Sequence, residues 1–168
     1  MKRLRDNIIL WSALAVVILF QRIASPWGRF FTFIDAVFIA VALLVFSGRV
    51  YTAYAAAGIA GALTDLIAMP FFGFHFFSYI AGVTSLWLMT LNLYRDNYVT
   101  KVFIVASGEA FIWLFYTMFV FAFHWGFKFH YMSAQVLPKI IVTTLAAAAV
   151  FKLIELYEER PGKWLRKT

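Results

Sequence analysis

The sequence predicts an all-α integral membrane protein, a compact bundle of six transmembrane helices, and two observations predict it. First, 64% of the 168 residues are hydrophobic and 14% are charged, whereas a soluble domain is roughly half apolar and about a quarter charged. Second, the apolar residues fall into long runs without period-2 alternation, which favours helices over an outer-membrane barrel. Six helices of ~20 residues use about 120 residues. We therefore expect residues 1–168 to form a single transmembrane domain.

The first three expected helices cover residues 7–25, 30–47 and 51–70. The first follows a basic N-terminus, as a signal peptide does, but no convincing small-residue cleavage site follows it, so we expect it to be retained. The second is joined to the third by the short link at 47–50. The third ends at Pro70, because proline and the nearby Gly73 favour a turn.

The last three expected helices cover residues 73–93, 99–124 and 134–157. The first of these ends in the polar turn at 94–97, the next closes near His124, and the last runs into a charged tail. With the N-terminus in the cytoplasm, 11 of the 15 basic residues lie on the cytoplasmic side and 4 on the other. The positive-inside rule therefore predicts that both termini are cytoplasmic.

Composition and motifs exclude several classes of function. The net charge of +7 comes from basic residues at the ends of apolar runs, a pattern typical of membrane topology and contact with anionic lipid, so we expect no nucleic-acid partner. Cysteine is absent, and no metalloprotease, nucleophile-elbow or phosphate-loop motif is present. We expect neither an enzyme nor a bound cofactor or metal.

Among the charged residues inside the expected helices, four stand out as candidates for burial: Asp35, Asp65, Glu109 and Lys139. Each is costly to expose to lipid, so we expect them to face the bundle interior. Asp35, Asp65 and Lys139 lie at similar depths and can meet in one outer layer, either as an ion-pair network or as a contact for a ligand or partner. Glu109 lies nearer the middle of the membrane with no obvious cation at its level, although Lys152 could reach part of the way. We expect Glu109 to be protonated there.

Small residues form a stripe on the third expected helix. Ala53, Ala57 and Gly61 recur at steps of four, a spacing that lets two helix backbones approach closely. Two interpretations are open: packing inside the bundle, or an interface for a partner helix.

The end of this helix carries a family resemblance. Gly61, Ala62, Asp65 and Leu66, followed by Gly73 and an apolar helix closed by a polar turn with arginine, resemble the central signature of the rod shape-determining protein MreD family. The chain departs from that pattern at 68–70, where Ala-Met-Pro replaces the more usual small, polar turn.

The resemblance implies a non-enzymatic scaffold in the bacterial inner membrane that acts in cell elongation. Such a protein binds MreC directly and helps to couple MreB filaments to peptidoglycan synthesis by RodA and a penicillin-binding transpeptidase. The implied fold is similar to the substrate-binding subunit of energy-coupling-factor vitamin transporters. A subunit of such a transporter is the alternative function, with polar and aromatic side chains converging on an outer pocket.

Overall fold

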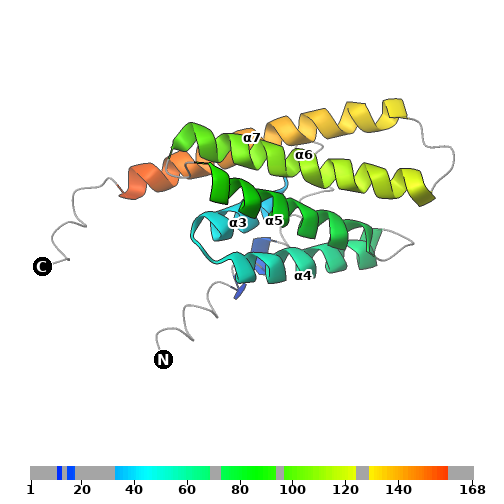
Figure 1. Cartoon of the computed structure of the whole chain (residues 1–168), viewed down its shortest axis with the longest axis horizontal. Coiled ribbons are helices and arrows are strands. Elements are labelled where there is room, and N and C mark those ends of the chain that lie inside the picture. Colours follow the sequence, from blue (N-terminus) through cyan, green and yellow to red (C-terminus); the bar gives the residue numbers. More distant parts are fainter. Residues whose placement is uncertain are drawn as a thin grey trace, which may run out of the picture.

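The computed structural model describes residues 11, 12, 15–17, 33–68, 73–93, 97–123 and 129–158. Within these ranges the chain is helical and contains no strand. From residue 33 onward the described helices are the short α3 (Ala36–Phe46) and the longer α4 (Val50–Ala68), α5 (Phe74–Asn92), α6 (Tyr98–Phe123) and α7 (Phe129–Glu158) (Figure 1). The helix expected over 7–25 falls mostly outside the described residues.

Three of these helices have the length and apolar composition of membrane-spanning segments. The segments are Phe74–Asn92, Tyr98–Met118 and Val136–Tyr157. About 20 helical residues span the ~30 Å hydrocarbon core of a bilayer. Large apolar side chains such as Phe103 and Leu114 are also exposed on the surface of α6, as expected for a helix in contact with lipid. The all-helical class predicted from the sequence is confirmed for the described residues, and these three helices have the length and composition of a membrane protein.

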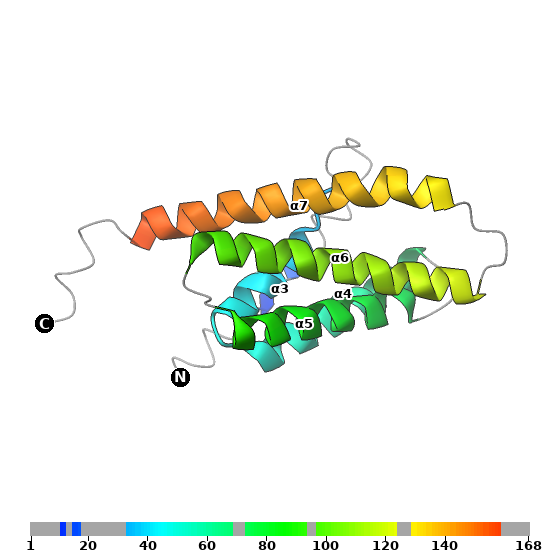
Figure 2. The same ribbon diagram turned by 45° about the horizontal axis from the view of Figure 1, so that its top comes forward.

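Consecutive helices run antiparallel and lie side by side. α4 packs on α5, α5 on α6, and α6 on α7, while the short α3 contacts all four (Figures 1 and 2). α3 lies at the centre of the core, and seven of its eleven residues are buried. Because α3 contacts each of the four longer helices, a polar group at its start is within reach of α5, α6 and α7 together.

The start of α3 differs from the sequence prediction. We expected a helix over 30–47 with Asp35 about five residues inside it, but Asp35 is the N-cap and the helix begins at Ala36. Asp35 Oδ1 accepts a hydrogen bond from the Phe38 backbone N–H at 3.0 Å. Aspartate is a favoured N-cap because its side chain satisfies an N–H that has no partner within the helix. At 1.5 Å per residue, the helix is about 16 Å long and cannot cross a bilayer by itself.

The boundaries of the other helices lie close to the expected ranges. α4, α5 and α6 differ from 51–70, 73–93 and 99–124 by two residues or fewer at each end. α7 begins at Phe129, five residues before the expected 134, and continues through Pro138.

Candidate functional site

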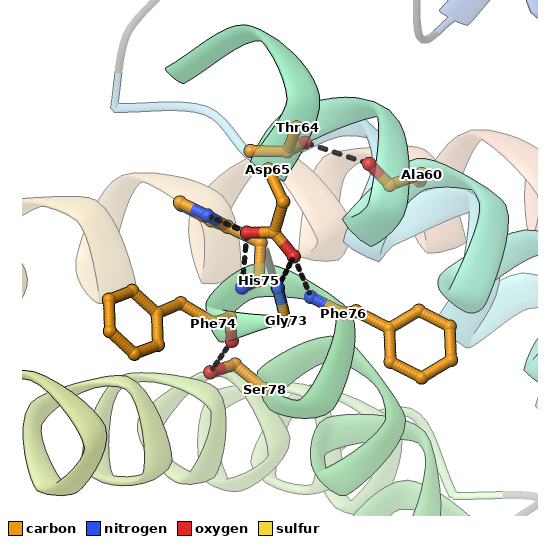
Figure 3. Close-up of polar contacts among 8 residues, drawn as sticks. All are labelled: Ala60, Thr64, Asp65, Gly73, Phe74, His75, Phe76 and Ser78. Carbon is orange, nitrogen blue, oxygen red and sulfur yellow. Dashed lines mark hydrogen bonds and ion pairs between the residues drawn. The ribbon is translucent and has the colours of Figure 1, made fainter. Parts of the chain in front are cut away.

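Asp65, near the C-terminal end of α4, lies at the centre of the first polar cluster. Its side chain is buried, with 1% exposed. Asp65 Oδ2 accepts hydrogen bonds from the backbone N–H groups of Gly73 at 2.9 Å and Phe76 at 3.0 Å, and Oδ1 accepts from the N–H of His75 at 2.8 Å (Figure 3). We call Asp65 and these three donor residues the turn cluster.

The turn cluster supplies hydrogen-bond acceptors for the backbone N–H groups at the start of α5. The first N–H groups of any helix have no partner within it, and the N-cap of α5 is Gly73, which has no side chain to supply one. Asp65 supplies the missing acceptors from the preceding helix. A carboxylate is also stabilised at the positive end of the helix dipole. The cluster therefore fixes the angle between α4 and α5.

His75 adds a side-chain contact to this cluster. Its Nδ1 lies 2.9 Å from Asp65 Oδ1, and its ring lies 5.2 Å from the ring of Tyr116 on α6. Because a carboxylate only accepts hydrogen bonds, Nδ1 is the protonated nitrogen in this arrangement. His75 thus connects the α4–α5 turn to α6.

The remaining motif residues separate into structural and exposed positions. A Cβ on Gly61 would lie 2.6 Å from Phe76 Cα and 2.8 Å from His75 O, so only glycine allows α5 to come this close. Gly73 has φ +117°, a backbone conformation that favours glycine. Ala62 is half-buried, and Leu66 is 72% exposed and lies outside the turn cluster.

Asp35, at the start of α3, lies at the centre of the second polar cluster. Besides capping α3, it accepts a hydrogen bond on Oδ2 from the Tyr79 hydroxyl at 2.6 Å, and Lys139 Nζ lies 3.8 Å from the same oxygen. The Asp35 backbone N–H donates to Thr143 Oγ1 at 3.0 Å, and Thr143 donates to the carbonyl of Phe33 at 3.1 Å. Side chains from α5 and α7 therefore converge on the start of α3.

Glu109 of α6 is part of the same cluster. Its side chain is fully buried, and Asp35 and Lys139 are both close enough to act on it electrostatically. The Trp113 indole donates to Glu109 Oε1 over 3.3 Å, and Lys139 Nζ lies 4.8 Å from the centre of the Trp113 ring system. Glu109 Oε2 has no hydrogen-bond partner among the described residues. We call Asp35, Glu109 and Lys139 the charged cluster.

The four predicted ionisable residues thus divide between two places. Asp35 and Lys139 do meet, as their depths suggested. Asp65 does not join them, because its oxygens are occupied by the start of α5. Glu109 was expected to lack a nearby cation apart from Lys152, but Lys139 is the lysine beside it, whereas Lys152 pairs with the exposed Glu155 at 2.8 Å.

The small-residue stripe packs inside the described helices. Ala53 and Ala57 have no exposed surface, and Gly61 is in contact with the backbone of α5. A partner helix could not reach Gly61 without displacing α5. Of the two interpretations of Ala53, Ala57 and Gly61, packing inside the bundle therefore agrees with the structure, and a partner interface at these residues does not, because helices of the same chain already use this close approach.

Several residues that form hydrogen bonds with the charged cluster were not identified from the sequence. The spacing of Glu109 and Trp113 places them on one face of a helix, so that pair could have been found. Tyr79 and Thr143 lie 44 and 108 positions from Asp35 in the chain, and only the packing of the helices brings them to it.

An apolar groove lies on the described part of the chain, and no metal-binding group is found there. The groove has a volume of about 520 Å³ and lies between α5 and α6, where its lining includes Ile80, Leu88, Phe111 and Phe115. None of the three charged-cluster residues lines it. No set of three or more acidic, histidine or cysteine side chains among the described residues could hold a metal ion.

No protein-family model, curated protein or solved structure matches the chain.

Proposed function

We propose that the chain is a non-enzymatic scaffold subunit of the bacterial cell-elongation complex, of the kind its resemblance to the MreD family implies. In this proposal it is a multi-span protein of the inner membrane, surrounded by lipid, with both termini in the cytoplasm. Three apolar helices long enough to span a bilayer support the membrane location. They do not by themselves favour one membrane function over another.

The observation that carries the proposal is the turn cluster. Gly61, Asp65 and Gly73 are three of the five motif residues on which the resemblance rests, and each of the three has a specific role at the α4–α5 turn: a close approach, a set of acceptors and a left-handed backbone conformation. A motif whose residues act together in one structural element is better support for a family resemblance than the same residues scattered over the surface. Its role is to build a rigid helical hairpin, which suits a scaffold.

Basic residues gather at one end of the helix bundle, and this supports the proposed orientation of the protein in the membrane. Arg49 precedes α4, Lys101 lies in the first turn of α6, and Lys152 lies near the end of α7. The Tyr98 hydroxyl donates to the carbonyl of Ala148 at 3.0 Å, so the start of α6 and the end of α7 are neighbours. We assign this end to the cytoplasmic side.

In the proposal MreC is the direct partner, and RodA, a penicillin-binding transpeptidase and MreB filaments belong to the same assembly. Because the small-residue stripe is filled by α5, MreC has to contact other residues. A photo-crosslinking scan can locate that contact, with Leu66 of α4 and Phe103 of α6 as two exposed starting positions, 72% and 59% exposed.

The decisive experiment is recovery of partners from native membranes. The tagged chain is solubilised in a mild detergent, and the captured proteins are quantified against an unrelated multi-span protein with the same tag. The proposal expects MreC to be enriched over that control, with RodA and the transpeptidase at lower levels. MreC at the control level would contradict it.

A specific observation favours the alternative, the substrate-binding subunit of an energy-coupling-factor vitamin transporter. Asp35, Lys139 and Trp113 converge from three elements, and polar and aromatic groups arranged in this way are what a ligand site requires. The alternative expects transporter ATPases instead of MreC in the same capture experiment, together with a small molecule that remains bound during purification. The apolar groove between α5 and α6 does not contain these residues, so it is not the ligand site that the alternative requires.

A further inference from the structure

The charged cluster has more negative than positive groups. Asp35 is 2% exposed and Glu109 has no exposed surface, and Lys139 is the cation close to both among the described residues. With all three side chains ionised, two carboxylates and one ammonium leave a net charge of −1 inside a membrane-spanning bundle. A buried charge without compensation is strongly destabilising.

The hydrogen bonds show which carboxyl group lacks compensation. Asp35 accepts from a backbone N–H and a tyrosine hydroxyl and has Lys139 3.8 Å away. Glu109 accepts one bond, from the Trp113 indole at 3.3 Å, and its Oε2 has no partner within the described chain. Charge-assisted hydrogen bonds to a carboxylate are typically about 2.7–2.9 Å long. Glu109 therefore has neither the donors nor the distances that a buried carboxylate needs.

A ligand for Glu109 has to be very small. The side chain has no exposed surface, and the groove between α5 and α6 does not reach it. The described residues also provide no third acidic, histidine or cysteine ligand for a metal ion. A proton is the ligand that fits an oxygen atom in such surroundings, and Lys139, whose side chain is 20% exposed, links the cluster to the surface.

We propose that Asp35, Glu109 and Lys139 form an intramembrane proton-binding site that holds one proton, on Glu109, beside an Asp35–Lys139 ion pair. The proton brings the net charge of the site to zero. The groups that face Glu109 or its neighbours are Asp35 at the start of α3, Tyr79 from α5, Trp113 from α6 and Lys139 from α7. This site does not depend on the role in cell elongation, since it follows from the charges and contacts of the cluster alone.

Infrared spectroscopy of the full chain in lipid nanodiscs tests this proposal through the carboxylic C=O band of a protonated carboxyl group. At neutral pH the wild type should show one such band from the membrane interior, and Glu109→Gln should abolish it. Asp35→Asn should also abolish it, because Lys139 would then pair with an ionised Glu109. Lys139→Met should roughly double it, because both carboxyl groups then bind protons.

Two controls keep the result clear. Glu155→Gln removes a carboxylate that is paired with Lys152 at the exposed end of α7, and it should leave the band unchanged. Monodisperse elution and an unaltered helical circular dichroism spectrum establish that each variant is folded. If Asp35→Asn fails to fold, because it alters the cap of α3, the opposite changes in Glu109→Gln and Lys139→Met still test the charge balance. The absence of a protonated band in the wild type, or its persistence in Glu109→Gln, would overturn the proposal.

Discussion

Two carboxylates of this membrane bundle, Asp65 and Glu109, are both buried, but their surroundings differ. Asp65 is met by three backbone N–H groups within 2.8–3.0 Å and by the imidazole of His75. Glu109 is met by one indole N–H at 3.3 Å, and one of its oxygens has no partner in the described chain. Both side chains are excluded from solvent, and hydrogen bonding separates the two.

The comparison shows what each residue does. Hydrogen bonds from an adjacent helix start compensate the charge of Asp65, so this residue is part of the fold and its removal leaves several N–H groups without a partner. Glu109 contributes little hydrogen bonding to the fold, so a carboxyl group at this position in the middle of α6 fits a site better than a structural role. An ionisable residue inside a membrane segment generally indicates a functional site. Of these two residues, Glu109 fits that expectation and Asp65 has a structural role.

The largest effect is expected at the close approach beside Asp65. Gly61→Leu places its Cβ 2.6 Å from Phe76 Cα and 2.8 Å from Phe76 N. These are backbone atoms of α5 and cannot move without displacing the helix start that Asp65 caps. Overpacking against movable side chains typically costs about 1–3 kcal/mol and occasionally more; because the opposing atoms here are backbone, we expect Gly61→Leu to fail to fold. Thermal unfolding in detergent measures it, with the exposed Leu63→Ala as control. A Gly61→Leu protein as stable as this control would show that α4 and α5 are not in close contact.

The next effect is expected from removing the acceptors themselves. Asp65→Ala leaves the N–H groups of Gly73, His75 and Phe76 without their common partner. Each buried group left unsatisfied costs about 1–3 kcal/mol, so the free energy of unfolding should fall by about 3 kcal/mol or more. Leu66→Ala, at the neighbouring exposed position, is the matched control and should change stability by less than about 0.5 kcal/mol. Equal losses of unfolding free energy in the two variants would show that Asp65 does not stabilise the fold.

A smaller loss of stability is expected when the hydroxyl group that binds the Asp35 backbone is removed. Thr143 accepts from the Asp35 N–H and donates to Phe33 O, whereas the buried hydroxyl of the adjacent Thr144 has no partner among the described residues. Thr143→Val should therefore cost about 1–2 kcal/mol. Thr144→Val is the matched control and should be neutral or stabilising, since it removes a buried polar group without a hydrogen bond. Unfolding temperatures of the two variants give the result, and a greater loss in Thr144→Val would contradict the hydrogen bonding around Asp35.

Part of this structure could be predicted from the sequence, for physical reasons that individual residues illustrate. The bounds of α5 and α6 followed from apolar runs interrupted by polar turns, and the meeting of Asp35 with Lys139 followed from their similar depth. The capping role of Asp65 could not be predicted from the sequence, because it depends on where the N–H groups of the next helix point after the turn. The sequence did not predict that Lys139 lies beside Glu109. A helix that is apolar all round, such as α6, does not indicate which of its faces packs against α3 and α7.

The functional interpretation of the small-residue stripe shows the same limit. The spacing of Ala53, Ala57 and Gly61 correctly indicates a close helix contact but is silent on whether the neighbouring helix belongs to the same chain or to a partner. The structure assigns the stripe to contacts within the chain. The partner surface therefore has to be sought by crosslinking and not by motif.

The most direct test of the distinction between the two carboxylates is to measure the thermal unfolding of Asp65→Asn and Glu109→Gln side by side. Asparagine replaces one acceptor of Asp65 with an NH₂ donor that faces backbone N–H groups, so the free energy of unfolding should fall by about 1–3 kcal/mol. Glutamine is nearly isosteric with a protonated glutamic acid and keeps an oxygen for Trp113, so Glu109→Gln should stay within about 0.5 kcal/mol of the wild type. A loss in Glu109→Gln as large as that in Asp65→Asn would contradict the account, because Glu109 would then be a structural carboxylate like Asp65.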